Sequence, residues 1–179
     1  MSKTNKYLVS LAVTAVLTAV AVIISRFLSI NLWNMSIGFS FVAIMLCGML
    51  TGTIWGGVCG ALTDFIGAIL FPFGPYFPGF TATAFLSGVL FGVLGIAAKK
   101  IKSTPKFIAL CIAVIVVKEV VCSLLLNTLW ISMLYGSPFF TVFVTRIPLS
   151  AVTAVLETLF AVIVKASIIP ALTKEKGKM

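Results

Sequence analysis

The sequence predicts an all-α integral membrane protein, a single domain over residues 1–179 that is built from six transmembrane helices. Hydrophobic residues make up 61% of the chain and charged residues only 9%, and the mean hydropathy is +1.23. A soluble domain cannot bury so much apolar surface, whereas a bilayer can cover it. The lysines lie in short segments between apolar runs, where the positive-inside rule places them. The net charge of +9 therefore does not indicate nucleic acid as a partner.

The first apolar run, at residues 7–27, predicts a helix that ends beside a cation. Small residues share one of its faces, at Ala12, Ala15 and Ala19. Such a face lets another helix approach closely, either within the bundle or from a second protein. Arg26 closes the helix, where it could extend toward the membrane interface or point inward at an anionic ligand. A polar and aromatic segment at 29–36 follows, and we expect it to be a loop.

The next two spans are predicted at 37–50 and 54–71, with a tight turn at 51–53 between them. The span at 37–50 is short, which indicates that it is tilted or stops below one surface. Glycine recurs at every fourth position from 48 to 60, at Gly48, Gly52, Gly56 and Gly60. We therefore expect these two helices to pack tightly.

The remaining spans are predicted at 80–98, 107–134 and 140–172. A basic loop at 99–106 separates the first two, and a turn at 135–138 separates the last two. This loop and both ends of the chain hold nearly all the lysines, so we expect both termini to be cytoplasmic. The even number of spans agrees with that orientation. The segments at 29–36, 71–79 and 135–139 then lie outside, and the polar and aromatic loop residues cluster there.

The stretch at 63–80 joins a carboxylate to a stiff aromatic loop. Asp64 lies among apolar residues, and the loop beyond it is rich in proline and aromatic side chains: Pro72, Phe73, Pro75, Tyr76, Phe77 and Pro78. Proline fixes φ and ends helices, so this loop has a defined shape. The stretch is typical of a ligand site at a membrane surface; an aromatic anchor at the interface is the alternative.

Charged residues within membrane spans are costly and usually functional. Asp64, Lys118 and Glu157 fall near mid-depth of three spans, so Lys118 could pair with Asp64, with Glu157 or with both. We expect Asp64 to contact a ligand, because it leads directly into the aromatic loop. Arg26 and Arg146 lie near the outer ends of their spans. Cations at the mouth of a pocket, aromatic side chains over it and a carboxylate below suit a ligand with an anionic end, a flat middle and paired N–H donors.

Several kinds of site have no support in the sequence. The chain has no histidine, which removes the usual general base and most metal sites, and no G-x-x-x-x-G-K-[ST] motif for ATP. The four cysteines lie inside apolar runs without a C-x-x-C pair, so we interpret them as small buried residues: Cys47, Cys59, Cys111 and Cys122. We expect no metal, no cofactor and no catalytic residue.

An ordered set of short motifs runs through nearly the whole chain. They are Ser25-Arg26-Phe27-Leu28-Ser29-Ile30, Ile37-Gly38-Phe39-Ser40-Phe41, Trp55-Gly56-Gly57, Gly60-Ala61-Leu62-Thr63-Asp64, Phe77-Pro78-Gly79-Phe80-Thr81, Leu126-Asn127-Thr128-Leu129-Trp130, Tyr135-Gly136 and Arg146-Ile147-Pro148. With these motifs in this order, the chain resembles the folate-specific S component of energy-coupling factor (ECF) transporters.

The resemblance implies a protein of the bacterial plasma membrane that binds folate or reduced folates from outside with high affinity. It implies delivery through a transmembrane coupling protein that two cytoplasmic ATPases drive. Ala15 and Ala19 match an A-x-x-x-A pattern that meets the coupling protein in that family. The ligand contacts implied by the resemblance are Arg26, Asp64, Asn127, Trp130 and Arg146, together with Phe39, Phe73, Tyr76 and Phe80.

Other functions stay open at this point. The same scaffold could bind another vitamin or a precursor. A self-sufficient secondary transporter could use Asp64, Glu157 and Lys118 as a proton relay, although six spans without a visible inverted repeat are unusual for such proteins. A membrane enzyme is the weakest alternative, because the chain has neither histidine nor a nucleophile–base motif.

Overall fold

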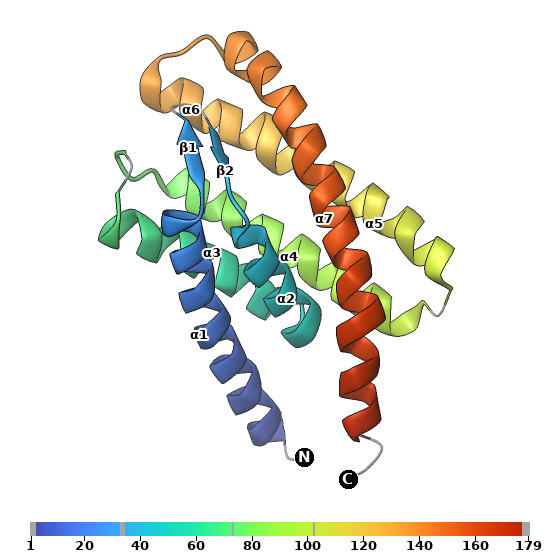
Figure 1. Cartoon of the computed structure of the whole chain (residues 1–179). Helices are drawn as coiled ribbons and strands as arrows, with labels where there is room; N and C mark the ends of the chain where they lie inside the picture. Colours follow the sequence, from blue (N-terminus) through green and yellow to red (C-terminus); the bar gives the residue numbers. More distant parts are fainter. Residues whose placement is uncertain (1–2, 33–34, 73, 102, 177–179) are drawn as a thin grey trace.

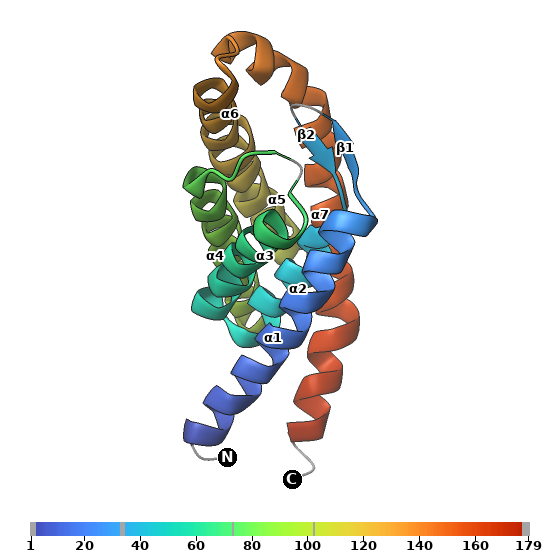
Figure 2. The same cartoon turned by 90° about the vertical axis from the view of Figure 1, so that its left-hand side faces the viewer.

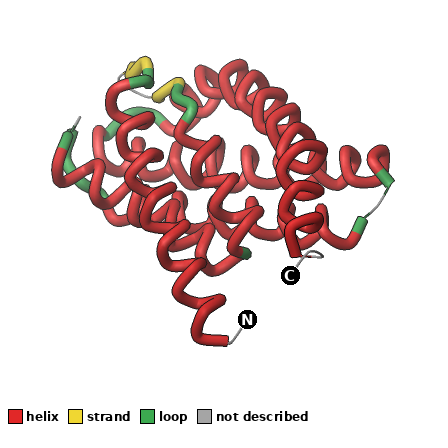
Figure 3. The backbone as a smooth tube through the Cα atoms, turned by 60° about the horizontal axis from the view of Figure 1, so that its bottom comes forward, coloured by secondary structure: helices red, strands yellow, loops and turns green. Residues whose placement is uncertain are grey.

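The computed structural model describes residues 3–32, 35–72, 74–101 and 103–176. Helices make up nearly all of these residues, and one short β-hairpin accompanies them (Figure 3). The predicted all-helical architecture is therefore confirmed, with the hairpin as an addition. The described elements are α1 (Lys3–Phe27), β1 (Ile30–Leu32), β2 (Met35–Ile37), α2 (Ser40–Thr51), α3 (Thr53–Leu70), α4 (Pro78–Lys100), α5 (Thr104–Lys118), the π-helix η1 (Glu119–Leu126), α6 (Asn127–Tyr135) and α7 (Phe139–Lys176).

The hairpin corrects two sequence-based boundaries. β1 and β2 pair antiparallel with Ile30 opposite Ile37, so the segment predicted as a loop at 29–36 contains strands, and the helix predicted from residue 37 begins at Ser40. Isoleucine favours a pleated strand, and a short apolar run does not separate strand from helix by its periodicity. The hairpin shortens α2 to 12 residues.

The helix predicted at 107–134 is a composite of three segments. α5, η1 and α6 follow one another without a break from Thr104 to Tyr135. The middle eight residues, Glu119–Leu126, form a π-helix. A π segment widens each turn through i→i+5 hydrogen bonds, and such segments often occur at functional sites. The long apolar run around this segment predicts one regular helix here.

The two chain termini lie at the same end of the bundle, and the hairpin lies at the opposite end (Figures 1 and 2). The connection from α6 to α7 also lies at the hairpin end, and the connection from α4 to α5 lies toward the termini (Figure 1). α7, with 38 residues, runs along the bundle from one end to the other. We call the two parts of the bundle the termini half and the hairpin half.

Glycine residues bring α2 and α3 into close contact with α4. A Cβ atom at Gly56 would lie 2.5 Å from the carbonyl oxygen of Gly88, and one at Gly48 would lie 2.7 Å from the amide nitrogen of Gly92. Only glycine allows the helix backbones to approach this closely. The tight packing expected between α2 and α3 is therefore present, but the glycines at every fourth position mainly pack against the backbone of α4. Gly52 instead makes the turn, with a φ of 108°.

The hydrophobic core fills the termini half. Ten buried residues from α2, α4, α5 and α7 form it: Met45, Met49, Phe91, Leu94, Ala98, Phe107, Cys111, Ile115, Ala161 and Val164. All four cysteines are buried and unbridged, which confirms their interpretation as small buried residues. The core therefore fills the space between the helices in the termini half and does not extend through the hairpin half.

Five helical segments among the described residues are long and apolar enough to cross a membrane: Thr4–Phe27, Thr53–Leu70, Pro78–Lys100, Thr104–Tyr135 and Phe139–Ser167. α2 is apolar but shorter than these. Large apolar side chains are exposed along the outer faces of the helices, and a bilayer would cover this surface. The chain is therefore a helical membrane protein.

Candidate ligand-binding cavity

A cavity of about 910 Å³ occupies the hairpin half. Its walls come from α1, α2, α3, α4, the composite helix α5–η1–α6 and α7, and the loop before α4 covers part of it. Phe91 lines the cavity and also belongs to the hydrophobic core, so it marks the boundary between the two halves. A cavity of this size suits a small organic molecule.

The charged lining of the cavity is balanced. Three cations and three carboxylates contribute to it: Arg26, Lys118, Arg146, Asp64, Glu119 and Glu157. The whole chain has 13 basic and only four acidic residues. Three of the four acids therefore lie in this one place, which indicates that the carboxylates are needed there and not merely tolerated.

One wall carries Arg26 and Asp64, and we call it the Arg26 wall. The Thr81 hydroxyl donates a hydrogen bond of 2.6 Å to Asp64 Oδ2, and the Tyr76 hydroxyl lies 3.1 Å from Thr81 Oγ1. Arg26 and Asp64 attract each other electrostatically. The Arg26 guanidinium packs against Gly67, where a Cβ atom would lie 2.6 Å from its nitrogens. The absence of a side chain at Gly67 thus creates the place for Arg26.

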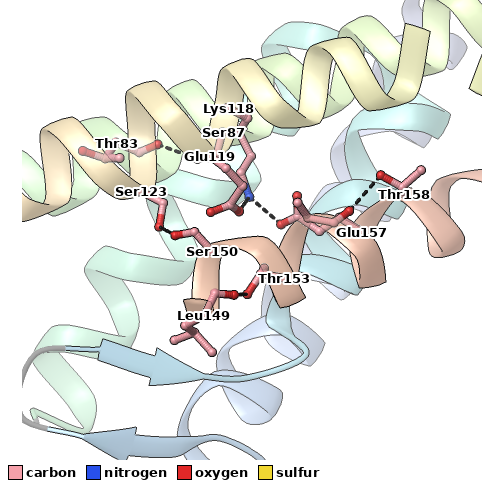
Figure 4. Close-up of polar contacts among 11 residues, drawn as sticks. Thr83, Ser87, Lys118, Glu119, Ser123, Leu149, Ser150, Thr153, Glu157 and Thr158 are labelled. Atoms are coloured by element: carbon pink, nitrogen blue, oxygen red, sulfur yellow. Dashed lines mark hydrogen bonds and ion pairs between the residues drawn. The ribbon is translucent and has the colours of Figure 1, made fainter. Parts of the chain in front are cut away.

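The opposite wall carries Lys118, Glu119 and Glu157, which we call the Lys118 cluster. Lys118 Nζ lies 2.5 Å from Glu119 Oε1 and 2.5 Å from Glu157 Oε1, and Figure 4 shows α5–η1 and α7 presenting these side chains to one another. All three residues are buried. The pairing expected between Lys118 and Glu157 is confirmed. The alternative pairing of Lys118 with Asp64 is not formed, because Asp64 is engaged by Thr81 and Arg26 on the other wall.

Two carboxylate oxygens of the Lys118 cluster lack a hydrogen-bond partner among the described residues. They are Glu119 Oε2 and Glu157 Oε2. Arg146, which is also buried, attracts Glu119 electrostatically. Beside the cluster, the hydroxyls of Ser123 and Ser150 lie 3.1 Å apart and join η1 to α7 (Figure 4).

The π-helix keeps one face of the composite helix directed at the cavity. Lining residues recur at every fourth position over four turns: Glu119, Ser123, Asn127, Ile131 and Tyr135. In a regular α-helix, each step of four residues overshoots a full turn by about 40°, so such a series would wind away from the cavity. The wider π turn undershoots a full turn and offsets part of this drift. On α7, the lining residues follow ordinary helical spacing: Arg146, Leu149, Ser150, Thr153 and Glu157.

Six of the nine ligand contacts expected from the sequence line the cavity. They are Arg26, Asp64, Tyr76, Phe80, Asn127 and Arg146. Asn127 also has a buried Oδ1 atom with no hydrogen-bond partner in the described part of the chain. Side chains from α1, α3, α4, α6 and α7, far apart in the sequence, thus meet around one space.

The other three expected contacts are placed differently. Trp130 lies directly behind the lining, where its Nε1–H donates a 3.0 Å hydrogen bond to Thr83 and its ring centroid lies 5.5 Å from that of Phe77. Phe39 is 54% exposed and outside the lining, whereas Phe41 is part of it. Phe73 lies outside the described residues.

Several lining residues were not singled out in the sequence. Glu119 is the main one, since on this helix the sequence drew attention to its neighbour Lys118, as a partner for Asp64 or Glu157. Two adjacent residues of an α-helix point about 100° apart, so the sequence alone suggests that only one of them faces inward. Phe41 gave no signal that separates it from Phe39. The hydroxyl residues Thr81, Thr83, Ser123 and Ser150 have no charge or spacing that marks them before the helices are placed together.

Comparison with known proteins gives consistent matches. A model of the family described as the ECF transporter substrate-specific component matches residues 9–165. The folate transporter FolT of Clostridium novyi (strain NT) is 36% identical over 138 residues, which cover 77% of this chain and 77% of that protein. The folate transporter FolT of Leuconostoc mesenteroides is 27% identical over 135 residues, covering 73% of this chain and 70% of that protein.

Two solved structures resemble the fold. A crystal structure of FolT bound with folic acid aligns with a TM-score of 0.74 and 31% sequence identity, over 85% of this chain and 89% of that one. The S-component for biotin from an ECF-type ABC transporter aligns with a TM-score of 0.64 over 93% of this chain and 95% of that one. The identity to the biotin protein is 16%, so that likeness concerns the fold alone.

Proposed function

The chain belongs to the substrate-specific components of ECF transporters, and we propose that it is the component that captures folate at the extracellular face of the membrane. Members of this family bind a substrate for transport, so the chain is a transporter subunit and not an enzyme. Two observations support folate as its substrate. Its relatives include proteins named folate transporters, and the chemistry of its own cavity suits folate.

The observation that carries the proposal is the mixed lining of the cavity in the hairpin half. Folate has a glutamate tail with carboxylates, an aromatic linker and a pterin ring with adjacent N–H donors. Arginine donates to carboxylates through a planar fork, aromatic side chains contact flat rings, and carboxylates accept from N–H groups. The lining supplies all three kinds of group in one space of about 910 Å³.

The proposed ligand contacts follow from this lining. Arg26 and Arg146 supply positive charge for the carboxylates of the tail, and Phe80 and Tyr76 contact the flat middle of the ligand. Asp64 contacts the ligand through the oxygen that Thr81 does not occupy. The remaining contacts are proposed for Asn127 directly, for Trp130 through the Phe77 and Thr83 layer in front of it, and for Phe39 and Phe73 on the resemblance to folate S components alone.

The transport step needs partners. We propose that a transmembrane coupling protein and two cytoplasmic ATPases drive transport, as is general for ECF transporters. Ala15 and Ala19 are exposed on α1, whereas Thr14 and Thr18 face the bundle. An exposed small-residue face is available to a second protein and supports the assignment of Ala15 and Ala19 to the coupling-protein interface.

We further propose a single domain that crosses the plasma membrane of a bacterium six times with both termini in the cytoplasm. The shared end of the two termini (Figure 1) supports an even number of crossings. α2 completes the count as a short span that the hairpin extends toward the surface. The distribution of lysines along the sequence supports the orientation.

Ligand binding by the purified chain in detergent tests the proposal. Folic acid, 5-formyltetrahydrofolate, riboflavin, thiamine and biotin are compared by calorimetry and by quenching of tryptophan fluorescence. Trp130 contacts two residues that line the cavity, so quenching reports directly on its occupation. One-to-one binding of folates alone is the expected result.

A response to another vitamin alone would reassign the substrate while leaving the family unchanged. No binding of any of the five compounds would overturn the folate proposal. Uptake by the chain alone, dependent on a proton gradient, would instead support the secondary transporter considered from the sequence.

A further inference from the structure

We propose that Glu119 determines ligand specificity by accepting hydrogen bonds from the N–H donors on the edge of the ligand's ring. This inference rests on the proposed function and concerns the same cavity. Folate carries an amino group beside a ring N–H on its pterin, and a carboxylate oxygen accepts well from such donors. Glu119 was not among the contacts expected from the sequence, and its role follows from how the Lys118 cluster is built.

Glu119 is held so that one oxygen is engaged and the other is not. Its Oε1 lies 2.5 Å from Lys118 Nζ, whereas its Oε2 is buried without a hydrogen-bond partner among the described residues. The side chain is only 7% exposed and lines the cavity. A buried carboxylate oxygen without a partner is costly. A ligand that brings N–H donors to the cavity removes this cost, and a ligand without them does not.

Lys118 and Glu157 act as positioning residues for Glu119. Lys118 Nζ bridges the two carboxylates and lies 5.4 Å from the centroid of the Phe91 ring, at the boundary with the filled core. Glu157 also lines the cavity, but its side chain is only 1% exposed, against 7% for Glu119. The ammonium group is thereby fixed from two sides, and Glu119 presents its second oxygen from a rigid support.

The sequence favoured Asp64 as the acceptor for the ring donors, and the structure favours Glu119. Asp64 Oδ2 already accepts the Thr81 hydroxyl, and the Arg26 guanidinium offsets its charge. Besides contacting the ligand through its second oxygen, Asp64 therefore keeps Arg26 and Thr81 in place on its own wall. The two acids come from opposite walls, α3 and η1, so the two assignments predict different results for the same pair of ligands.

The test compares two ligands on the wild-type chain and on single variants. The ligands are folic acid and its analogue in which a methyl group replaces the 2-amino group, and Kd is measured by calorimetry in detergent. We expect the wild-type chain to bind the analogue about 10- to 100-fold more weakly, as a lost hydrogen bond to a charged group implies. Glu119→Gln should weaken the binding of folic acid by a similar factor and leave the Kd of the analogue nearly unchanged, so that the preference for folic acid over the analogue disappears.

Two variants of the other acids serve as comparisons. Glu175→Gln changes the acid near the end of α7, about 27 Å along the helix from Glu157 and at the termini end, and should keep the wild-type preference. Asp64→Asn should weaken both ligands by the same factor. A preference that is lost in Asp64→Asn and kept in Glu119→Gln would overturn the inference in favour of Asp64.

The remaining outcomes also decide the matter. Equal affinity of the wild-type chain for both ligands overturns the role of Glu119 without any variant, and so does an equal loss for both ligands in Glu119→Gln. If Glu119→Gln fails to fold, Glu119→Asp retains the charge beside Lys118 and should reduce the preference through the shorter side chain. A wild-type chain that binds no folate at all overturns the proposed function itself.

Discussion

The termini half of the bundle is filled, whereas the hairpin half is hollow, although the same helices build both. α2, α4, α5 and α7 meet in the termini half through apolar side chains such as Leu94 and Phe107, which are fully buried. Beyond Phe91, the lining changes to charged and hydroxyl-bearing residues around a cavity of about 910 Å³. The transition occurs within single helices and needs no domain boundary.

The difference indicates that stability and ligand recognition are located in different parts of the chain. Close packing supplies most of the cohesion of a helix bundle in a membrane, since lipid is as apolar as the side chains. The hairpin half has six charged groups around its cavity, four of them buried, which are kept in balance by pairing and add little net stability. Substitutions in one half should therefore leave the property of the other half largely intact, and the following variants test this separation.

The largest effect is expected for Gly88→Leu in the contact between α3 and α4. A Cβ atom at Gly88 would clash with the backbone of Gly56, and backbone atoms of a helix cannot move aside as the end of a side chain can. We expect the variant to fail to give monodisperse protein in gel filtration. Val93→Leu is the matched control, because Val93 is 37% exposed on the same helix. Normal folding of both variants would contradict the close backbone contact described between α3 and α4.

A smaller loss of stability is expected for Leu94→Ala in the filled half. Leu94 is fully buried, and removing such a side chain leaves a cavity that costs about 2–5 kcal/mol. The midpoint of thermal unfolding in detergent should fall, while folic acid affinity below that temperature should stay unchanged. Val93→Ala, on the exposed face, should shift the midpoint far less. Loss of folic acid affinity in Leu94→Ala with an unchanged midpoint of thermal unfolding would contradict the assignment of stability to the termini half and ligand binding to the hairpin half.

The reverse pattern is expected for Arg26→Ala in the hollow half. Loss of the guanidinium removes charge-assisted hydrogen bonds to the ligand, so folic acid affinity should fall by about 10- to 100-fold with little change in the unfolding midpoint. Arg26→Lys keeps the positive charge but not the planar fork of donors, so its folic acid affinity should lie between those of the wild-type chain and Arg26→Ala. Unchanged affinity in the alanine variant would remove Arg26 from the site.

The smallest effect on both properties is expected for the double variant Ala15→Leu, Ala19→Leu. Both residues are exposed on α1, so larger side chains there should leave stability and folic acid binding intact. Assembly with the coupling protein and the ATPases, measured by co-purification, should be lost because the close helix approach is blocked. Weaker ligand binding in the isolated chain would instead mean that this face packs inside the bundle.

The sequence predicts the spans well because hydropathy averages over many residues, and the helices at 54–71 and 80–98 differ from α3 and α4 by a few residues at most. The hairpin and the π-helix escape prediction because each depends on a few residues, too few for a periodicity that separates it from a loop or from a regular helix. The hairpin decides where α2 starts, and the π-helix decides which side chains of the composite helix face the cavity.

The charged lining was only partly predictable. An acid or arginine within an apolar run stands out in the sequence, which is how Arg26, Asp64 and Arg146 were found. Which partner each charge takes depends on how the helices are placed together, and this is why Lys118 could be assigned to either acid. Glu119 was missed because regular helical geometry turns it away from its neighbour Lys118, and the π segment that adjusts this geometry has no sequence signature.

Hydrogen–deuterium exchange of the purified chain with and without folic acid tests the central claim most directly. If the hollow half is the folate site, saturating folic acid should slow exchange in peptides from residues 74–87, 118–137 and 146–157, which line the cavity. Peptides from the filled half, such as residues 94–98 and 107–115, should exchange at the same rate in both samples. Protection confined to the termini half, or no change anywhere despite bound folic acid, would contradict the account.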